Sequence, residues 1–132
     1  MHGLKTFLAT LLLIAGISVN ALAARDWTPY TPEALASAQE QNAIVLVDVH
    51  ADWCPACRAQ KPILDELRAD PALEGVVFIK VNFDEDKAFL KEHKVQKQAT
   101  ILMFKGKEEL GRTVFETDRE RLREFVLSSA AK

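Results

Sequence analysis

The stretch that decides the fold is residues 43–67, AIVLVDVHADWCPACRAQKPILDEL. It begins with a nearly continuous apolar run over 43–49, rich in β-branched residues and typical of a strand covered on both faces. Cys54 and Cys57 follow, and small or apolar residues then recur at helical spacing, at Ala56, Ala59, Ile63, Leu64 and Leu67. Pro62 lies inside this pattern and predicts a kink in the helix axis. The stretch therefore predicts a buried strand, a C-x-x-C pair and a helix in direct succession.

Patterns on both sides of this stretch predict the remaining elements. Upstream, Thr31 and Pro32 are typical of a helix cap and first turn, and the helix is expected to end near Gln41. Downstream, the chain predicts a strand over 76–83, a short helix over 86–93, strands over 99–105 and 110–115 joined at Gly106, and a last helix with a Thr117/Glu120 capping box. The order α-β-α-β-α-β-β-α predicts an α/β fold in which a central mixed sheet has helices on both faces.

The composition fits one ordinary globular domain. The chain has 132 residues, and its 48% hydrophobic and 27% charged content argues against disorder. Lys and Arg number 17 against 19 Asp and Glu, so the formal net charge is −2 and nucleic acid is not expected as a partner. Two cysteines are too few for a small fold held together by disulfides.

Residues 1–23 are predicted to be a signal peptide. Lys5 precedes an uncharged run over 6–24, and Ala21-Leu22-Ala23 has the small-x-small pattern of a cleavage site. We expect cleavage after Ala23, leaving residues 24–132 as a domain that works outside the cytosol, where disulfides persist. The alternative is an uncleaved membrane anchor, although the run is at the short edge of the roughly 20 residues that span a bilayer.

The spacing of the two cysteines predicts unequal roles for them. Residues three apart are neighbours on a helix surface, so the thiols can meet within disulfide geometry. Cys54 is expected at the helix cap, where backbone N–H groups and the helix dipole stabilise a thiolate, and this predicts that it is the nucleophile. Pro55 lacks only an N–H that has no helical partner there, which leaves the N–H groups of Ala56 and Cys57 free to face the sulfur. Cys57 is expected to be the more buried, resolving thiol.

Two other interpretations of the cysteines remain open. A structural disulfide over so short a loop constrains the unfolded chain little. A closed zinc site needs four ligands, but the sequence has no second C-x-x-C, and His50 and His93 lie far apart along the chain. A redox pair therefore explains the motif best, and no metal site is predicted.

The segments VDVHADWCPACR (47–58) and PILDEL (62–67) resemble the thioredoxin family, most closely the exported thioredoxin-like domains of bacterial thiol:disulfide interchange proteins. The resemblance runs from residue 26 to the last expected helix. It implies a thioredoxin-like fold and protein-disulfide oxidoreductase activity on protein disulfides and dithiols, with no bound cofactor.

The same resemblance implies roles for particular side chains. Cys54 corresponds to the attacking thiol, Cys57 to the resolving thiol and Trp53 to the aromatic residue that shapes the docking surface. Asp48 matches the family's buried acid, and because burial raises the pKa of a carboxyl group, it is expected to take a proton from Cys57. The alternative for Asp48 is a strand acid that bonds to a loop. Lys80 matches the family's lysine near that acid.

Two positions depart from the family pattern. The family places a cis-proline before the threonine of its third core strand, but here Ala99 precedes Thr100. A cis bond before a non-proline residue costs about 2.5–4 kcal/mol, so we expect a trans bond or a rearranged loop, with consequences for substrate pairing and metal exclusion. His50 stands where relatives carry an aromatic residue, and it can tune Cys54, supply a third metal ligand or simply end the strand.

The resemblance and the predicted signal peptide together imply a thiol:disulfide oxidoreductase of the bacterial periplasm or cell exterior, and since the sequence shows no sign of oligomerisation we expect a monomer. The chain is too short to hold the inserted helical domain of the family's dedicated oxidases, which favours reduction or isomerisation fed by a membrane electron donor. One alternative is a copper-handling module that uses Cys54, Cys57 and His50. Another is a redox-inert binding domain.

Overall fold

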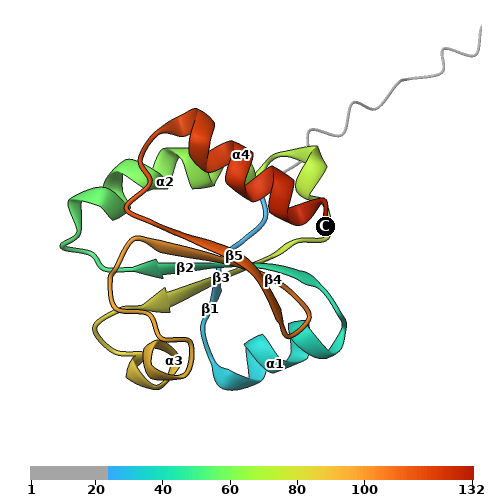
Figure 1. Ribbon diagram of the computed structural model, residues 1–132, viewed down its shortest axis with the longest axis horizontal. Helices are drawn as coiled ribbons and strands as arrows, with labels where there is room; N and C mark the ends of the chain where they lie inside the picture. Colours follow the sequence, from blue (N-terminus) through green and yellow to red (C-terminus); the bar gives the residue numbers. More distant parts are fainter. Residues whose placement is uncertain (1–23) are drawn as a thin grey trace, which may run out of the picture.

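The computed structural model describes residues 24–132 and arranges them in three layers, a sheet with helices on both sides (Figure 1). The elements are β1 (Thr28–Pro29), α1 (Pro32–Glu40), β2 (Ile44–His50), α2 (Pro55–Arg68), the 3-10 helix η1 (Pro71–Leu73), β3 (Val77–Asn82), α3 (Lys87–Glu92), β4 (Thr100–Lys105), β5 (Glu108–Val114) and α4 (Arg119–Ala130). The signal peptide and cleavage site predicted from the sequence lie outside the described residues. Between residues 24 and 132, no helix combines the length and apolar character needed to cross a bilayer.

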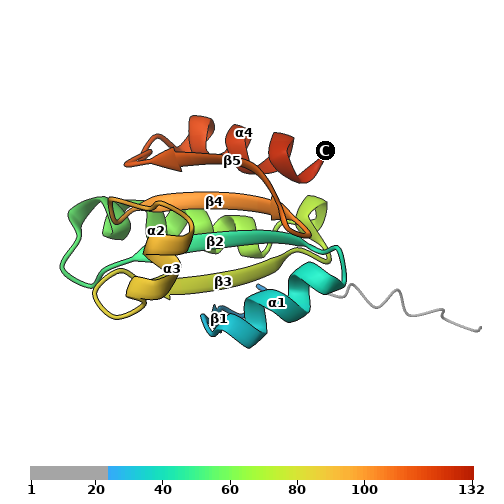
Figure 2. The same ribbon diagram turned by 60° about the horizontal axis from the view of Figure 1, so that its bottom comes forward.

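The sheet has five strands in the order β1-β3-β2-β4-β5. β2 runs parallel to β3 and antiparallel to β4, and β4 and β5 form an antiparallel hairpin. Helices α1 and α3 cover one face and α2 and α4 cover the other, as the two views of the ribbon show (Figures 1 and 2). The predicted α/β class with a mixed sheet is confirmed.

The central strand β2 determines which side chains face the cysteines. Val45, Val47 and Val49 join the core under α1 and α3, whereas Leu46 joins the core under α2 and α4. Because alternate residues of a strand point to opposite faces, Asp48 and His50 lie on the same face as Leu46. The burial of β2 on both sides therefore places an acid and a histidine beneath α2.

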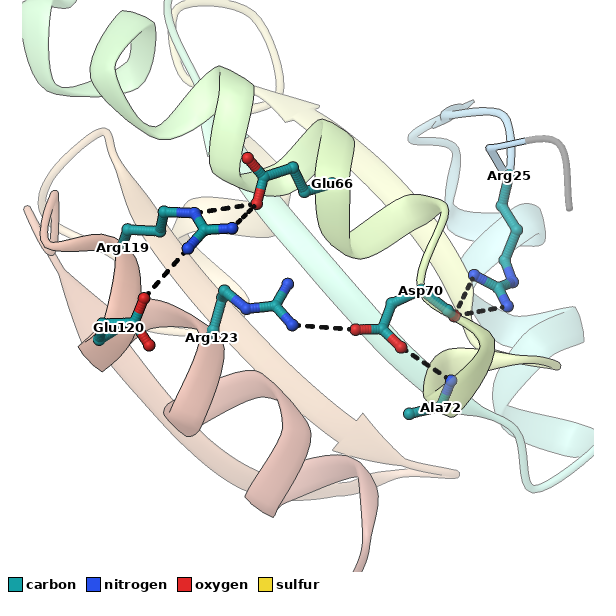
Figure 3. A network of polar contacts seen from close by, with 7 residues as sticks. All are labelled: Arg25, Glu66, Asp70, Ala72, Arg119, Glu120 and Arg123. Carbon is teal, nitrogen blue, oxygen red and sulfur yellow. Dashed lines mark hydrogen bonds and ion pairs between the residues drawn. The ribbon is translucent and has the colours of Figure 1, made fainter.

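Ion pairs join α4 to the C-terminal half of α2 and to Asp70 in the turn that follows it. The Arg119 guanidinium lies 2.7 Å from the Glu66 carboxylate, and Arg123 lies 3.1 Å from the carboxylate of Asp70 (Figure 3). The second carboxylate oxygen of Asp70 caps η1 by accepting the N–H of Ala72 at 2.9 Å. Arg25 donates to the backbone carbonyl of Asp70, so the start of the described chain joins the same network. These contacts hold the far end of α2 while its N-terminus carries the cysteines.

Several local predictions are wrong. The last helix is capped by Asp118, whose carboxylate accepts the N–H of Arg121 at 2.9 Å, and not by Thr117 with Glu120. On α2, Ala59 is exposed and Gln60 is buried, because the buried stripe follows Cys57, Gln60, Ile63, Leu64 and Leu67. β1 and η1 are too short to produce a recognisable pattern in the sequence.

Candidate redox site

Cys54 is the N-cap of α2, as its position in the sequence predicts. Its backbone is extended, and its sulfur accepts the N–H of Cys57 at 3.1 Å. Pro55 occupies the first helical position and interrupts no hydrogen bond there. The sulfur of Cys54 therefore lies where a helix terminus stabilises negative charge.

Both thiols are free and covered by their neighbours. Cys54 is 0% exposed and Cys57 is 2% exposed, so the prediction that Cys57 is the more buried of the two is wrong. The reason is that Ala51 and Ala99 pack against both cysteines, with the half-buried Phe83 beside them. A substrate disulfide can reach the sulfur of Cys54 only when some of this cover moves.

Asp48 lies beneath the pair as a buried carboxyl group. It is 3% exposed, and its Oδ1 has no hydrogen-bond partner in residues 24–132, which gives no support to the loop-bonded alternative. Burial raises the pKa of Asp48 to about 6, and the positive charges of Lys80 and His50 act in the opposite direction. Lys80 is directly opposite Asp48 in the β2/β3 register, and its ammonium lies 4.7 Å from the ring centroid of Trp27.

Cys57 needs a base before it can act as a nucleophile. Burial, above all, raises the pKa of Cys57 to about 12, and hydrogen bonding to Cys54 and the nearby carboxyl group of Asp48 act in the same direction. A cavity of about 10 Å³ is lined by both Asp48 and Cys57. That volume matches a single water molecule, so the carboxyl group and the thiol can exchange a proton across it.

Trp53 lies at the surface beside the cysteines and is held there by a residue that the sequence analysis did not identify. Its indole N–H donates to the Asp84 carboxylate at 2.9 Å, and its ring meets Phe83 edge-on with centroids 6.4 Å apart. The ring remains 55% exposed. Because β2 and β3 are parallel, the segments after them meet at one edge of the sheet, and this rule could have identified Asp84.

The segment before β4 packs against the cysteines, and it has Ala99 at the position where the family pattern has a proline. All peptide bonds in residues 24–132 are trans, and Ala99 has a φ of 55°, in the left-handed region. This agrees with the predicted trans bond or rearranged loop. The Ala99 carbonyl accepts the N–H of Phe115 at 3.0 Å, and Thr100 is buried and donates its hydroxyl to the Lys97 carbonyl at 2.7 Å.

Gln60 ties this segment to α2, and the sequence analysis missed it. Its buried side-chain amide donates to the carbonyls of Ala99 at 3.2 Å and Glu116 at 3.1 Å. One side chain thus joins the helix of the cysteines to the segments that precede β4 and follow β5. A polar residue three positions after Cys57, on the buried stripe of the helix, is the sequence signal that could have identified it.

The imidazole of His50 points toward Asp52 in the loop after β2, and it is not part of a metal-binding cluster. Its Nε2 lies 3.1 Å from the carboxylate of Asp52. Within residues 24–132, no group of three or more His, Cys, Asp or Glu side chains is arranged to hold a metal ion. The copper-handling alternative with Cys54, Cys57 and His50 therefore has no support in the arrangement of these side chains.

The fold and the site together define a class of protein. A dithiol at a helix N-terminus, above a buried carboxyl group on this sheet, is the arrangement of a thiol:disulfide oxidoreductase with the thioredoxin fold. The family model described as Thioredoxin matches residues 29–128, and the chain belongs to that family. It is a thioredoxin-type oxidoreductase with Cys54 and Cys57 as its redox pair, and thioredoxins act on protein disulfides.

Individual relatives agree with this assignment. A thioredoxin H-type from Brassica campestris is 38% identical over 103 residues, which cover 78% of this chain and 79% of that protein. A thioredoxin from Chlamydia pneumoniae is 35% identical over 85 residues, covering 64% of this chain and 81% of that protein. The crystal structure of Trxlp from Edwardsiella tarda EIB202 superposes with a TM-score of 0.74 at 40% identity, covering 76% of this chain and 98% of that one.

Proposed function

We propose that this protein reduces or isomerises protein disulfides in the periplasm, with Cys54 as the nucleophile and Cys57 as the resolving thiol. The observation that carries the assignment is the hydrogen bond from the Cys57 N–H to the Cys54 sulfur at the start of α2. This donor favours negative charge on Cys54, whereas burial keeps Cys57 protonated at neutral pH.

The reaction follows from these two different environments. The Cys54 thiolate attacks one sulfur of a substrate disulfide, and the other substrate sulfur leaves and takes up a proton. Asp48 then accepts the proton of Cys57, and the Cys57 thiolate attacks the Cys54 sulfur. The bond from Cys54 to the substrate breaks, and the second substrate sulfur takes up a proton. The substrate gains two electrons and two protons, and the protein retains a Cys54–Cys57 disulfide.

The direction, the location and the electron donor belong to the same proposal. The apolar pattern of residues 1–23 supports export with cleavage after Ala23. Within residues 24–132 the strands and helices follow one another without the inserted helical domain of dedicated oxidases, which supports a reducing or isomerising role. Each turnover leaves a Cys54–Cys57 disulfide that must be reduced again, so we propose that a dithiol of a membrane protein is the electron donor. We further propose that this protein acts as a monomer.

Insulin reduction by the full chain tests the chemistry. We expect wild-type protein to precipitate insulin in the presence of a thiol reductant and Cys54→Ser to be inactive. Cys57→Ser is the matched variant, since it keeps the nucleophile and is expected to accumulate a mixed disulfide detectable by mass spectrometry. A mixed disulfide through Cys57 in the Cys54→Ser protein, with none in Cys57→Ser, would reverse the assigned roles.

Fractionation of a bacterium that expresses the full chain tests the location. The proposal predicts a periplasmic protein whose N-terminus is Ala24 by mass spectrometry. An intact N-terminus in the membrane fraction would instead support the anchored alternative, and an intact protein in the cytosol would contradict export.

A further inference from the structure

His50 lines both a small cavity and a larger open groove, as do Trp27 and Lys80. It lines the cavity of about 10 Å³ that Asp48 and Cys57 share, and it also lines a groove of about 390 Å³ on the outside of the sheet edge. Its side chain is 22% exposed, so it is neither buried with Asp48 nor free in solvent. The ring therefore forms part of the boundary between the Asp48 carboxyl group and water.

The backbone aligns three side chains from the interior to the surface. Asp48 and His50 point to the same face of β2, and their Cα atoms are roughly 6–7 Å apart at the rise of a β-strand. Next along the chain, the carboxylate of Asp52 accepts a hydrogen bond from Nε2 of His50 at 3.1 Å when that nitrogen carries its proton, and Asp52 is fully exposed. Asp48, His50 and Asp52 thus lead in two steps from a buried acid to bulk water.

Charged and titratable groups from several elements surround His50. The groups that line the two cavities with it are Asp48 on β2, Cys57, Lys61 and Asp65 on α2, Lys80 on β3, Tyr30 before α1, Asp52 after β2, and Asp84, Glu85 and Asp86 after β3. Lys80 is the cation that lines both cavities, and the groove side is predominantly acidic.

The proposed reaction requires proton movement that burial obstructs. Asp48 gains a proton from Cys57 in each turnover and must lose it before it can act again, yet Asp48 is almost wholly buried. We propose that His50 transfers this proton between Asp48 and bulk water, while Asp52 orients its ring. The inference rests on the proposed function. His50 acts through Asp48 and touches neither sulfur in this role, so it is a positioning and proton-transfer residue.

The step is balanced without any electron transfer. The Asp48 carboxylic acid gives its proton to neutral His50 across the small cavity, leaving a carboxylate and an imidazolium. The imidazolium then releases a proton to water or buffer in the groove and returns to its neutral form. When the protein is reduced by its donor, the same steps run backwards.

A pH-jump experiment on the reduced protein, obtained by expressing the full chain, tests this transfer directly. The protein is moved from pH 5 to pH 7.5 in dilute buffer, and loss of the infrared carbonyl band of protonated Asp48 is followed in time. The band is assigned by its absence in Asp48→Asn. We expect His50→Gln to lose its proton at least about a hundredfold more slowly than wild type, since positioned proton-transfer groups contribute about 10²–10⁴-fold. Added imidazole should restore the rate.

Two controls keep the test specific. His93→Gln changes a histidine that packs against Phe89 and Phe104, away from both cavities, and is expected to leave proton release unchanged. His50→Phe removes the ionisable ring but keeps an aromatic group, and it should be slow and respond to imidazole as His50→Gln does. A wild-type rate in His50→Gln would overturn the inference, as would slow release that imidazole leaves unchanged.

The same samples separate this inference from the proposed function. If wild-type protein does not reduce insulin, the proposed function fails whatever the rate of proton release. If it reduces insulin while proton release is independent of His50, only the role of His50 fails.

Discussion

The N–H of Ala99 donates a hydrogen bond to the carbonyl of Val49, with nitrogen and oxygen 2.8 Å apart. A proline at position 99 could not make this bond, because it has no N–H. The Ala99 carbonyl is also occupied, by Phe115 and Gln60. Both polar backbone groups of Ala99 therefore serve the protein's own fold, and neither is free to pair with the backbone of a substrate.

Restoring the family's proline should therefore destabilise the protein. Ala99→Pro loses the bond to Val49 and must exchange a φ of 55° for the proline value near −65°. We expect the free energy of unfolding to fall by about 2 kcal/mol or more, measured by urea denaturation. Ala99→Gly is the matched control and should stay within about 1 kcal/mol of wild type, because glycine adopts positive φ freely. A proline variant as stable as wild type would contradict this prediction.

Replacing the buried acid should stabilise the protein in neutral solution. The pKa of Asp48 is raised to about 6 in the folded state from its ordinary value of 3.8, so the folded protein binds the proton more tightly than the unfolded chain. Stability therefore falls as pH rises from about 4 to about 6, and the cost remains above that range. Asp48→Asn should be more stable than wild type by about 2–3 kcal/mol at pH 8, and the gain should vanish near pH 3.5. Denaturation at several pH values measures the difference, and a constant difference would rule out the raised pKa.

The same substitution should slow the second chemical step. Without the Asp48 carboxylate, Cys57 has no buried base, and its pKa of about 12 leaves almost no thiolate at pH 7. We expect Asp48→Asn to accumulate the mixed disulfide on Cys54 and to resolve it faster as pH rises toward 10. Acid quenching followed by mass spectrometry measures the intermediate, and unchanged resolution at pH 7 would exclude Asp48 as the base.

The left-handed backbone conformation of Phe115 should lower the free energy of unfolding. Its φ of 57° is in the left-handed region, which costs a residue with a side chain about 1–2 kcal/mol, and its ring is 45% exposed. Phe115→Gly should be about 1 kcal/mol more stable than Phe115→Ala, because both lack the ring and only glycine relieves the backbone. Thermal unfolding of the pair checks this difference, and equal stabilities would show that the backbone relaxes without cost.

Removing the amide that joins α2 to the segments before β4 and after β5 should cost stability. Gln60→Met keeps the volume of the side chain but leaves the Glu116 carbonyl without its bond from Gln60. We expect a loss of about 1 kcal/mol in urea denaturation, because the two lost hydrogen bonds outweigh the gain from removing the Gln60 amide oxygen, which has no hydrogen-bond partner within residues 24–132. Lys61→Met changes the exposed neighbouring position on the same helix and should have little effect. Equal stabilities of the two variants would show that the Gln60 bonds contribute nothing.

The sequence by itself determined the α/β class, the central buried strand and the position of Cys54 at a helix cap. These features depend on hydrophobic periodicity and on contacts within one turn of helix, which are written in neighbouring residues. The buried acid was also predictable, because an aspartate inside the apolar run 43–49 can only be enclosed by the helices on either side.

Tertiary structure alone decided how the site is enclosed. The Gln60 amide bonds and the bond from Trp53 to Asp84 join segments 31 to 56 residues apart in the chain. The positive φ of Ala99 likewise belongs to a segment that packs against the distant cysteines. Local periodicity can mark Gln60 as a buried polar residue, but which segments these side chains reach depends on which strands pair and in which register. The equal burial of Cys54 and Cys57 has the same origin, since Ala99 covers both thiols from the segment just before β4, a strand that adjoins β2 only after the sheet has assembled.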